Sequence, residues 1–144
     1  MQHINLQIEH VLYGKEIIEM TQFLELVETV ENQIFDNGIY KNGPTTYRTK
    51  RSSFAKPGNV EFEIFVPISQ EVDTIGDLDY ISKFEIEKCV AETTCFSEKM
   101  FEAIDGLVEE LKFEGLKHVD DILYLTIHPL YNKLFVTVSL PYEE

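Results

Sequence analysis

A carboxylate and two aromatic rings occupy alternating positions of two segments that are typical of strands. Glu63 and Phe65 alternate with aliphatic residues in the segment 60–68 (VEFEIFVPI), and Phe135 and Thr137 do so near the C-terminus. Aromatic rings offer flat apolar area with a negative π face, and a partly buried carboxylate attracts a cation. These residue types predict non-covalent binding of a small cationic or aromatic molecule.

Two tyrosines extend this candidate site. Tyr47 and Tyr124 occupy matching positions of an internal repeat, each in a short segment typical of a strand. Period-two alternation allows both rings to join the face that carries Glu63. The predicted ligand-binding residues are Glu63, Phe65, Tyr47, Tyr124, Phe135 and Thr137. The alternative reading places both tyrosines at the edge of the core and leaves Glu63 as a solvated strand charge.

The elements that must position these residues come from a chain that nearly repeats itself. Residues 23–49 align without a gap with residues 100–126, which places Gly38 on Gly115. A strand ending in proline follows in each half. One supersecondary unit written twice predicts a pseudo-twofold axis with a groove along it.

Hydrophobic periodicity predicts the elements of each unit. The first repeat, about 4–69, is predicted to hold strands at 4–12, 45–50 and 60–68 and a helix at about 16–36. After a linker at about 70–80, the second repeat, about 81–142, is predicted to hold strands at 83–90, 122–127 and 134–140 and a helix capped by Ser97. The predicted fold is one α+β domain over residues 1–144, a duplicated βαββ unit with an antiparallel-rich sheet, helices on one face and a groove between the repeats.

Alternation also assigns the strand residues to two faces. The residues expected to pack beneath the helices are Val60, Phe62, Ile64, Val66, Val136, Val138 and Leu140. The opposite face is then aromatic and acidic. The basic cluster of Arg48, Lys50, Arg51 and Lys56 is predicted to lie on a solvated hairpin tip.

The doubled βαββ plan, the helix–Gly–strand segment and a strand ending in Val-Pro or Leu-Pro resemble the GyrI-like family. This family comprises effector-binding domains related to the ligand domains of multidrug-sensing transcription regulators and to SOUL haem-binding proteins. The resemblance covers about residues 4–142, and its main motifs are Gln33–Tyr47 and 60–68, with Glu92–Tyr124 and Val136–Tyr142 as the second copy. It implies a stand-alone ligand-binding member without the helix-turn-helix domain of the regulators.

The resemblance also implies which residue would contact a charged ligand. In ligand-binding relatives an acidic residue of the last strand faces the groove, and the matching position in this chain is Thr137. The pseudo-symmetric position in the first half, Glu63, does carry a carboxylate. The missing carboxylate at Thr137 argues against multidrug-type recognition, and it leaves open a flipped geometry in which Glu63 is the groove acid.

Composition argues against several classes of function. The chain has 26 acidic and 12 basic residues, a formal net charge of −14, so it would repel nucleic acid and anionic membrane surfaces. No apolar run approaches the roughly 18 residues of a membrane span, and the N-terminus does not read as a signal peptide. Cys89 and Cys95 lack CxxC spacing, which predicts two packed, reduced thiols in a cytoplasmic protein.

No catalytic or metal-binding motif stands out in the sequence. The four histidines lack metal-ligand spacing, and the chain has no GxSxG motif and no Gly-rich phosphate loop. The sequence therefore favours a binding protein over an enzyme, without a cofactor or a metal ion.

Two functions stay open at this point. The first is a cytoplasmic protein that binds a small molecule in the groove between the repeats. The second is an interaction or accessory protein that engages another polypeptide, as short bacterial relatives found beside secretion-system genes suggest. An open groove lined by aromatic rings favours the first, and a filled groove with apolar residues exposed elsewhere favours the second.

Overall fold

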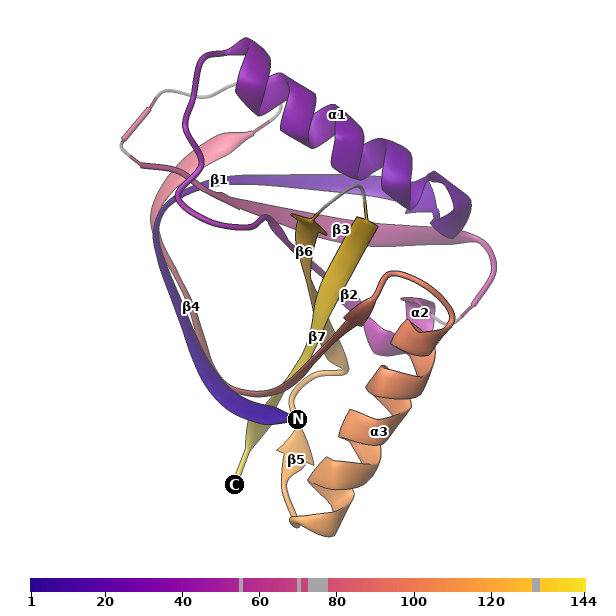
Figure 1. Ribbon diagram of the computed structural model, residues 1–144. Coiled ribbons are helices and arrows are strands. Elements are labelled where there is room, and N and C mark those ends of the chain that lie inside the picture. The colour runs from indigo at the N-terminus through magenta and orange to yellow at the C-terminus, as the bar shows by residue number, and fades with distance from the viewer. Residues whose placement is uncertain (55, 70, 73–77, 131–132) are drawn as a thin grey trace.

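The computed structural model describes residues 1–54, 56–69, 71–72, 78–130 and 133–144 (Figure 1). Its elements, in chain order, are β1 (Gln2–Glu19), the 3-10 helix η1 (Met20–Gln22), α1 (Phe23–Asp36), β2 (Thr46–Lys50), α2 (Arg51–Phe54), β3 (Asn59–Pro67), β4 (Asp79–Cys95), α3 (Lys99–Phe113), β5 (Lys117–His118), β6 (Ile122–Leu130) and β7 (Lys133–Glu143). The order β1–α1–β2–β3 recurs as β4–α3–β6–β7, which confirms the predicted duplication. The predicted linker falls partly on residues 73–77, outside the described residues.

The strand pairing follows the duplication. The described residues form a sheet of seven strands in the order β4–β1–β3–β2–β6–β7–β5, and β4 also pairs with β7. Matching strands of the two units pair antiparallel with each other, β1 with β4 and β2 with β6. Within the units, the β1–β3 and β2–β3 pairs correspond to the β4–β7 and β6–β7 pairs. The fold is therefore the predicted α+β architecture with a pseudo-twofold relation between its halves.

Both long helices pack on one face of this sheet and form the main core with it (Figure 1). The helical residues buried in this core are Phe23, Val27, Val30 and Ile34 of α1 and Met100, Ala103, Ile104, Leu107 and Leu111 of α3. All seven strand residues that alternation assigns to this face are buried in the same cluster. The remaining strand face, which points away from α1 and α3, is called the second face below.

A glycine in the left-handed region ends each long helix, as the repeat predicts. The φ angles are 67° at Gly38 and 71° at Gly115. The amide that follows each glycine donates back into the last helical turn, from Ile39 to the Ile34 carbonyl and from Leu116 to the Leu111 carbonyl. This is the hydrogen-bond pattern that a left-handed residue allows at a helix C-terminus.

The predicted boundary between the first strand and the first helix is wrong. The sequence predicts a break at Tyr13-Gly14-Lys15 and a helix from about residue 16, whereas β1 continues to Glu19 and α1 begins at Phe23. Residues 11–19 of β1 pair with the whole length of β3. This long-range ladder overrides the weak strand propensity of the local sequence.

The second unit shows a similar difference. β4 extends to Cys95, beyond the predicted strand end at residue 90, because residues 89–95 pair with β7. The N-cap of α3 is Glu98, one residue after the predicted Ser97. The Ser97 hydroxyl still accepts a hydrogen bond from the Lys99 amide at 3.3 Å.

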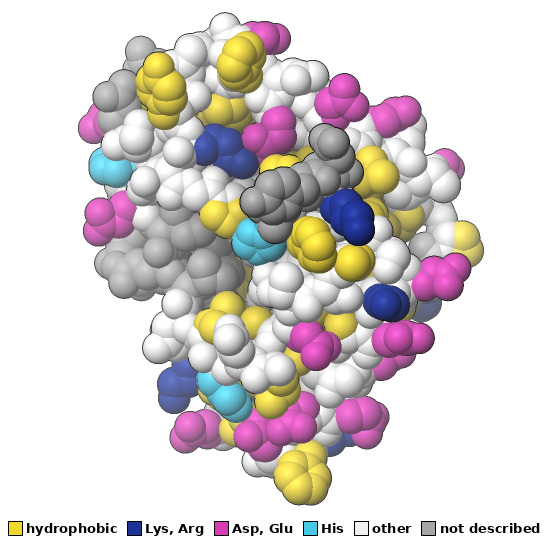
Figure 2. Space-filling view, in the orientation of Figure 1, with side chains coloured by type: hydrophobic (Ala, Val, Ile, Leu, Met, Phe, Trp, Pro, Cys, Tyr) yellow, Lys and Arg dark blue, Asp and Glu magenta, His cyan; other side chains and the backbone are white. Residues whose placement is uncertain are grey.

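The two long helices carry acidic side chains on their solvent-exposed faces. Figure 2 shows acidic side chains along the part of the surface formed by α1 and α3. The exposed ones include Glu25, Glu28, Glu102, Asp105 and Glu109. These residues occupy the outward helix faces.

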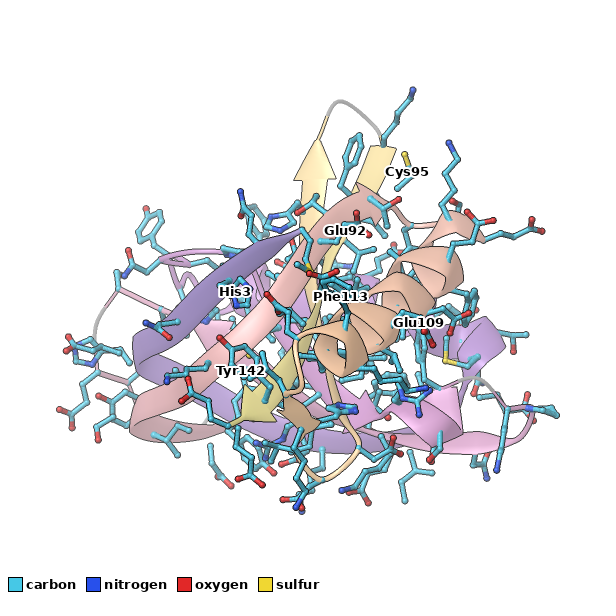
Figure 3. All side chains as sticks on the ribbon, turned by 90° about the horizontal axis from the view of Figure 1, so that it is seen from below. His3, Glu92, Cys95, Glu109, Phe113 and Tyr142 are labelled. Carbon is cyan, nitrogen blue, oxygen red and sulfur yellow. The ribbon has the colours of Figure 1, made fainter. Side chains whose placement is uncertain are left out.

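The first and last strands bring the chain ends close together. His3 Nδ1 of β1 lies 2.9 Å from the Tyr142 hydroxyl of β7, and both side chains are labelled in Figure 3. Cys89 is buried, as predicted, but Cys95 is exposed, so the prediction that both thiols are packed is wrong for Cys95. Among the described helices, none is long and apolar enough to cross a membrane.

Candidate ligand-binding site

The second face is filled at its centre. Val11, Phe65, Cys89 and Tyr124 form a small buried cluster there, separate from the main core. The Tyr13 ring packs against the Phe65 ring with centroids 5.2 Å apart. A ligand therefore meets closed apolar packing at the centre of this face, and the cavities lie towards its ends.

One end of the second face is a charged site built around Glu63. Arg48 lies directly across from Glu63 in the β2–β3 ladder. Its Nε donates to Glu63 Oε1 at 2.8 Å and its Nη2 donates to Oε2, while the Tyr13 hydroxyl donates to Oε2 at 2.6 Å. The Arg48 guanidinium also lies over the Phe65 ring, with Cζ 5.1 Å from the ring centroid. The carboxylate predicted to attract a ligand cation is thus already paired with a cation of the protein.

These contacts shift the titration of the groups around Glu63. Partial burial would raise the pKa of Glu63, but hydrogen bonds from Arg48 and Tyr13 outweigh it and lower that pKa below its usual value. Burial, together with the hydrogen bond to Glu63, raises the pKa of Tyr13 to about 12. Burial also raises the pKa of Tyr124, although the Arg48 guanidinium beside it acts in the opposite direction. At neutral pH this end therefore holds an ionised Glu63–Arg48 pair flanked by two neutral tyrosines.

A mixed polar cavity borders this ion pair. It has a volume of about 490 Å³, and Arg48, Lys50, Glu61, Glu63 and Asp120 supply charges of both signs to its walls. Lys50 Nζ donates to the Asp120 carbonyl at 2.7 Å. With charges of both signs on its walls, this cavity does not offer the acidic aromatic groove that the sequence predicts.

The other end of the second face carries a larger and less charged cavity. Its volume is about 760 Å³. The lining residues are Lys41, Gly43, Pro44, Thr93, Ile127, His128, Pro129, Phe135 and Thr137. They come from the loop before β2 in the first unit and from β4, β6 and β7 in the second, so both repeats build this cavity.

The polar groups of this cavity are paired with one another or with neighbours. Thr137 Oγ1 lies 2.7 Å from Thr93 Oγ1 and 2.9 Å from His128 Nε2, which makes a short hydrogen-bonded row across three strands. Burial lowers the pKa of His128, so its imidazole is neutral at pH 7. Lys41 Nζ donates to both oxygens of Glu31, at 2.8 and 3.0 Å. Among the described lining residues, no charge is left without a counter-charge at neutral pH.

The six predicted site residues are thus distributed over four places. Glu63 lies in the charged site, Phe65 and Tyr124 lie in the central cluster, and Phe135 and Thr137 line the 760 Å³ cavity. Tyr47 is 0% exposed and belongs to the main core on the helix side, where the centroid of its ring lies 5.1 Å from that of the Phe23 ring. The prediction that Tyr47 joins the second face is therefore wrong.

One additional residue in the second repeat explains the error for Tyr47. Nine positions separate Gly38 from Tyr47, whereas ten separate Gly115 from Leu125, the residue that pairs with Tyr47 and shares its face. The ungapped alignment instead matched Tyr47 with Tyr124. Because strand side chains alternate, a slip of one residue moves a side chain to the opposite face.

The two tyrosines on opposite faces lead to a stability prediction. Among the described residues, the buried Tyr47 hydroxyl has no hydrogen-bond partner, and a buried hydroxyl without a partner is destabilising. Tyr47→Phe is therefore expected to raise the free energy of unfolding by about 1 kcal/mol. Urea denaturation measures the change.

Tyr124→Phe is the matched control for this prediction, because the Tyr124 hydroxyl interacts with Arg48. Its substitution should lower the free energy of unfolding or leave it unchanged. A stability loss of the same size in both variants would contradict the assignment of the two rings to opposite faces.

Sequence reasoning missed Arg48, His128 and Tyr13 as parts of the site. The sequence predicts that Arg48 lies on a solvated hairpin tip, whereas its side chain is only 28% exposed. His128 alternates with Tyr124 along β6, so the period-two pattern already places both on one face. Tyr13 had no such signal, because the predicted strand ended before it.

The comparisons with known proteins bear on the fold alone. A comparison with protein-family models found no match, and one with curated proteins found none either. Among solved structures, the C-terminal domain of EcmrR aligns with a TM-score of 0.72 at 11% identity, over 99% of this chain and 98% of that domain. In the EcmrR–DNA complex the TM-score is 0.71 at 11% identity, and the alignment spans 99% of this chain but 57% of the EcmrR chain.

Two further structures share the architecture. An uncharacterised conserved protein from Listeria innocua aligns with a TM-score of 0.66 at 9% identity, over 99% of this chain and 92% of that chain. SAV2435 bound to tetraphenylphosphonium aligns with a TM-score of 0.53 at 8% identity, over 99% and 94% of the two chains. These structures agree with the GyrI-like fold that the sequence resemblance implies, and the fold is one in which ligand binding occurs.

Proposed function

We propose that this protein binds a small, uncharged aromatic or apolar molecule in the 760 Å³ cavity at the Phe135 end of the second face. The observation that carries the proposal is the cavity itself, to which both repeats contribute. Its volume falls within the range of roughly 300–1,000 Å³ that is usual for small-molecule sites, which are mostly apolar with few polar anchors.

The lining of the cavity supports a neutral ligand. Phe135, Ile127 and two prolines offer apolar surface, and the Thr93–Thr137–His128 row offers hydrogen bonds. Glu31 pairs with Lys41, and the His128 imidazole is neutral because burial lowers its pKa. Neither a cation nor an anion would find a free counter-charge among these residues.

The structural neighbours support ligand binding in general. SAV2435 has this fold and was solved with tetraphenylphosphonium, a cation. In this chain the acidic residue predicted for such a ligand, Glu63, is paired with Arg48. For this reason we place the ligand of this protein at the Phe135 end and expect it to be neutral.

A thermal-shift screen with Phe135→Ala tests the proposal. Neutral aromatic compounds should raise the melting temperature of the wild-type protein, because a ligand that binds only the folded state stabilises it. We expect Phe135→Ala to weaken the affinity of such a compound at least about tenfold, since a buried aromatic contact is removed. Isothermal titration calorimetry measures the dissociation constants.

Phe113→Ala is the matched control, because Phe113 is 88% exposed at the end of α3 and lies outside the cavity lining (Figure 3). Its affinity for the same compound should equal that of the wild type. If Phe135→Ala and the wild type bind the compound with equal affinity, or if both variants lose affinity equally, the proposal that the ligand binds in this cavity is wrong.

A second candidate function is binding of another polypeptide. The filled centre of the second face favours it, as do three strongly exposed rings, Phe35 at 82%, Tyr40 at 81% and Phe113 at 88%. Under this alternative, compounds of every charge class leave the melting temperature unchanged. A stabilising compound whose effect depends on Phe135 contradicts it.

A further inference from the structure

We infer that Arg48 is the built-in occupant of a cation site formed by Glu63 of the charged site and by Phe65 and Tyr124 of the adjoining central cluster, and that its presence makes this site reject free cations. This inference does not depend on the proposed ligand at Phe135, because the two ends share no lining residue. It concerns which ligand charge this site excludes, whereas the proposed function concerns the ligand of the other cavity.

The geometry around Arg48 is that of a bound cation. Its guanidinium makes a two-point hydrogen-bonded pair with the Glu63 carboxylate and lies 5.1 Å from the centroid of the Phe65 ring. Carboxylates bind guanidinium in this two-point manner, and aromatic faces attract cations. Both kinds of contact that a ligand cation would seek are thus made by one side chain of the protein.

The position of Arg48 follows from strand pairing. Arg48 lies opposite Glu63 on β3 and opposite Tyr124 on β6, so three adjacent strands hold the group together. The Arg48 and Glu63 side chains are only 28% and 22% exposed, and Phe65 is 2% exposed. The ring and the carboxylate are therefore largely shielded from solvent while Arg48 is in place.

A tethered cation has a strong advantage over a free one. Arg48 is attached to β2 beside Glu63, so its effective concentration at the carboxylate is high, and a free cation must displace it. Displacement would also leave a partly buried guanidinium without its counter-charge, which is unfavourable. Removal of the guanidinium should abolish both obstacles and leave a vacated acidic, aromatic site.

The test measures binding of benzylguanidinium to the wild-type protein and to Arg48→Ala by isothermal titration calorimetry. We expect Arg48→Ala to bind benzylguanidinium at least about tenfold more tightly than the wild type, because the carboxylate and the ring become available to the probe. Circular dichroism verifies the fold of the variant. If Arg48→Ala does not fold, Arg48→Met keeps the aliphatic stem and carries the same expectation.

Two controls link any gain in affinity to the proposed site. The double variant Arg48→Ala/Glu63→Gln has the same space without the carboxylate, and benzylurea has the same shape as the probe without its charge. The gain should vanish in the double variant and should not occur with benzylurea. A gain that persists in either control, or no gain in the Arg48 variant, overturns the inference.

The wild-type protein provides an independent check. The affinity of the wild type for benzylguanidinium is compared with that of Glu63→Gln. A weaker affinity in Glu63→Gln would mean that the probe reaches Glu63 although Arg48 is present, and it would overturn the inference. We expect Glu63→Gln to leave the wild-type affinity for this probe unchanged.

Discussion

Phe23→Ala is expected to lower the free energy of unfolding by about 3–5 kcal/mol, the largest effect of any substitution considered for this protein. Phe23 is the first residue of α1 and is 1% exposed. Its ring packs against the rings of Tyr47, Phe62 and Phe96, with centroids 5.1, 4.9 and 5.5 Å away. Removal of the ring would leave a cavity at the place where the helix of the first unit meets two strands and the segment before α3.

Phe35→Ala on the same helix is the matched control. Phe35 is 82% exposed, so the same substitution should change the free energy of unfolding by less than about 0.5 kcal/mol. Urea denaturation of the two variants gives the comparison. Similar losses in both would mean that the apolar stripe of α1 does not face the core in the way described.

The second large effect is the coupling between Arg48 and Glu63. A double-mutant cycle built from Arg48→Met and Glu63→Gln should give a coupling energy of about 1–3 kcal/mol at pH 7, because the pair is largely shielded and bonded at two points. The exposed pair of Lys117 and Glu143, at 77% and 57% exposure, is the control, with a coupling energy below about 1 kcal/mol. Urea denaturation of the single and double variants measures both cycles.

The pH dependence of this coupling has a definite sign. Hydrogen bonds from Arg48 and Tyr13 lower the pKa of Glu63 below its usual value of 4.5, so the carboxylate binds a proton less readily in the folded than in the unfolded protein. The stabilisation is therefore fully present above about pH 4.5 and is lost as the pH falls through the lowered pKa. A coupling energy that stays the same well below that pH, where Glu63 is protonated, would contradict the ion pair.

Much of the fold follows from patterns that are local in the sequence. The apolar spacing of 3–4 residues in α1 and α3, the glycines that end both helices and the alternation in β3 and β7 each report on their own segment. The internal repeat then shows that one unit occurs twice. These signals are strong because helix and strand periodicities decide which side of an element is apolar, whatever the element packs against.

The boundaries of β1 and β4 depend on partners far away in the chain. Residues 13–19 of β1 contain Gly14 and three charged residues, so their composition does not predict a strand. Pairing with β3 keeps them extended. The same pairing brings Tyr13 to Glu63, a contact between residues that are 50 positions apart in the sequence.

The sequence by itself determined the residue types of the second face and their alternation, which placed Glu63, Phe65, Phe135 and Thr137 together on one side of their strands. Only the tertiary structure decided the face of Tyr47 and the partner of Glu63. A single additional residue between Gly115 and Leu125 reverses the alternation for Tyr124 relative to Tyr47, and the register between β2 and β3 sets Arg48 against Glu63. Register arises from hydrogen bonds between distant segments, and so the charge that a ligand would meet at Glu63 could not be read from either strand alone.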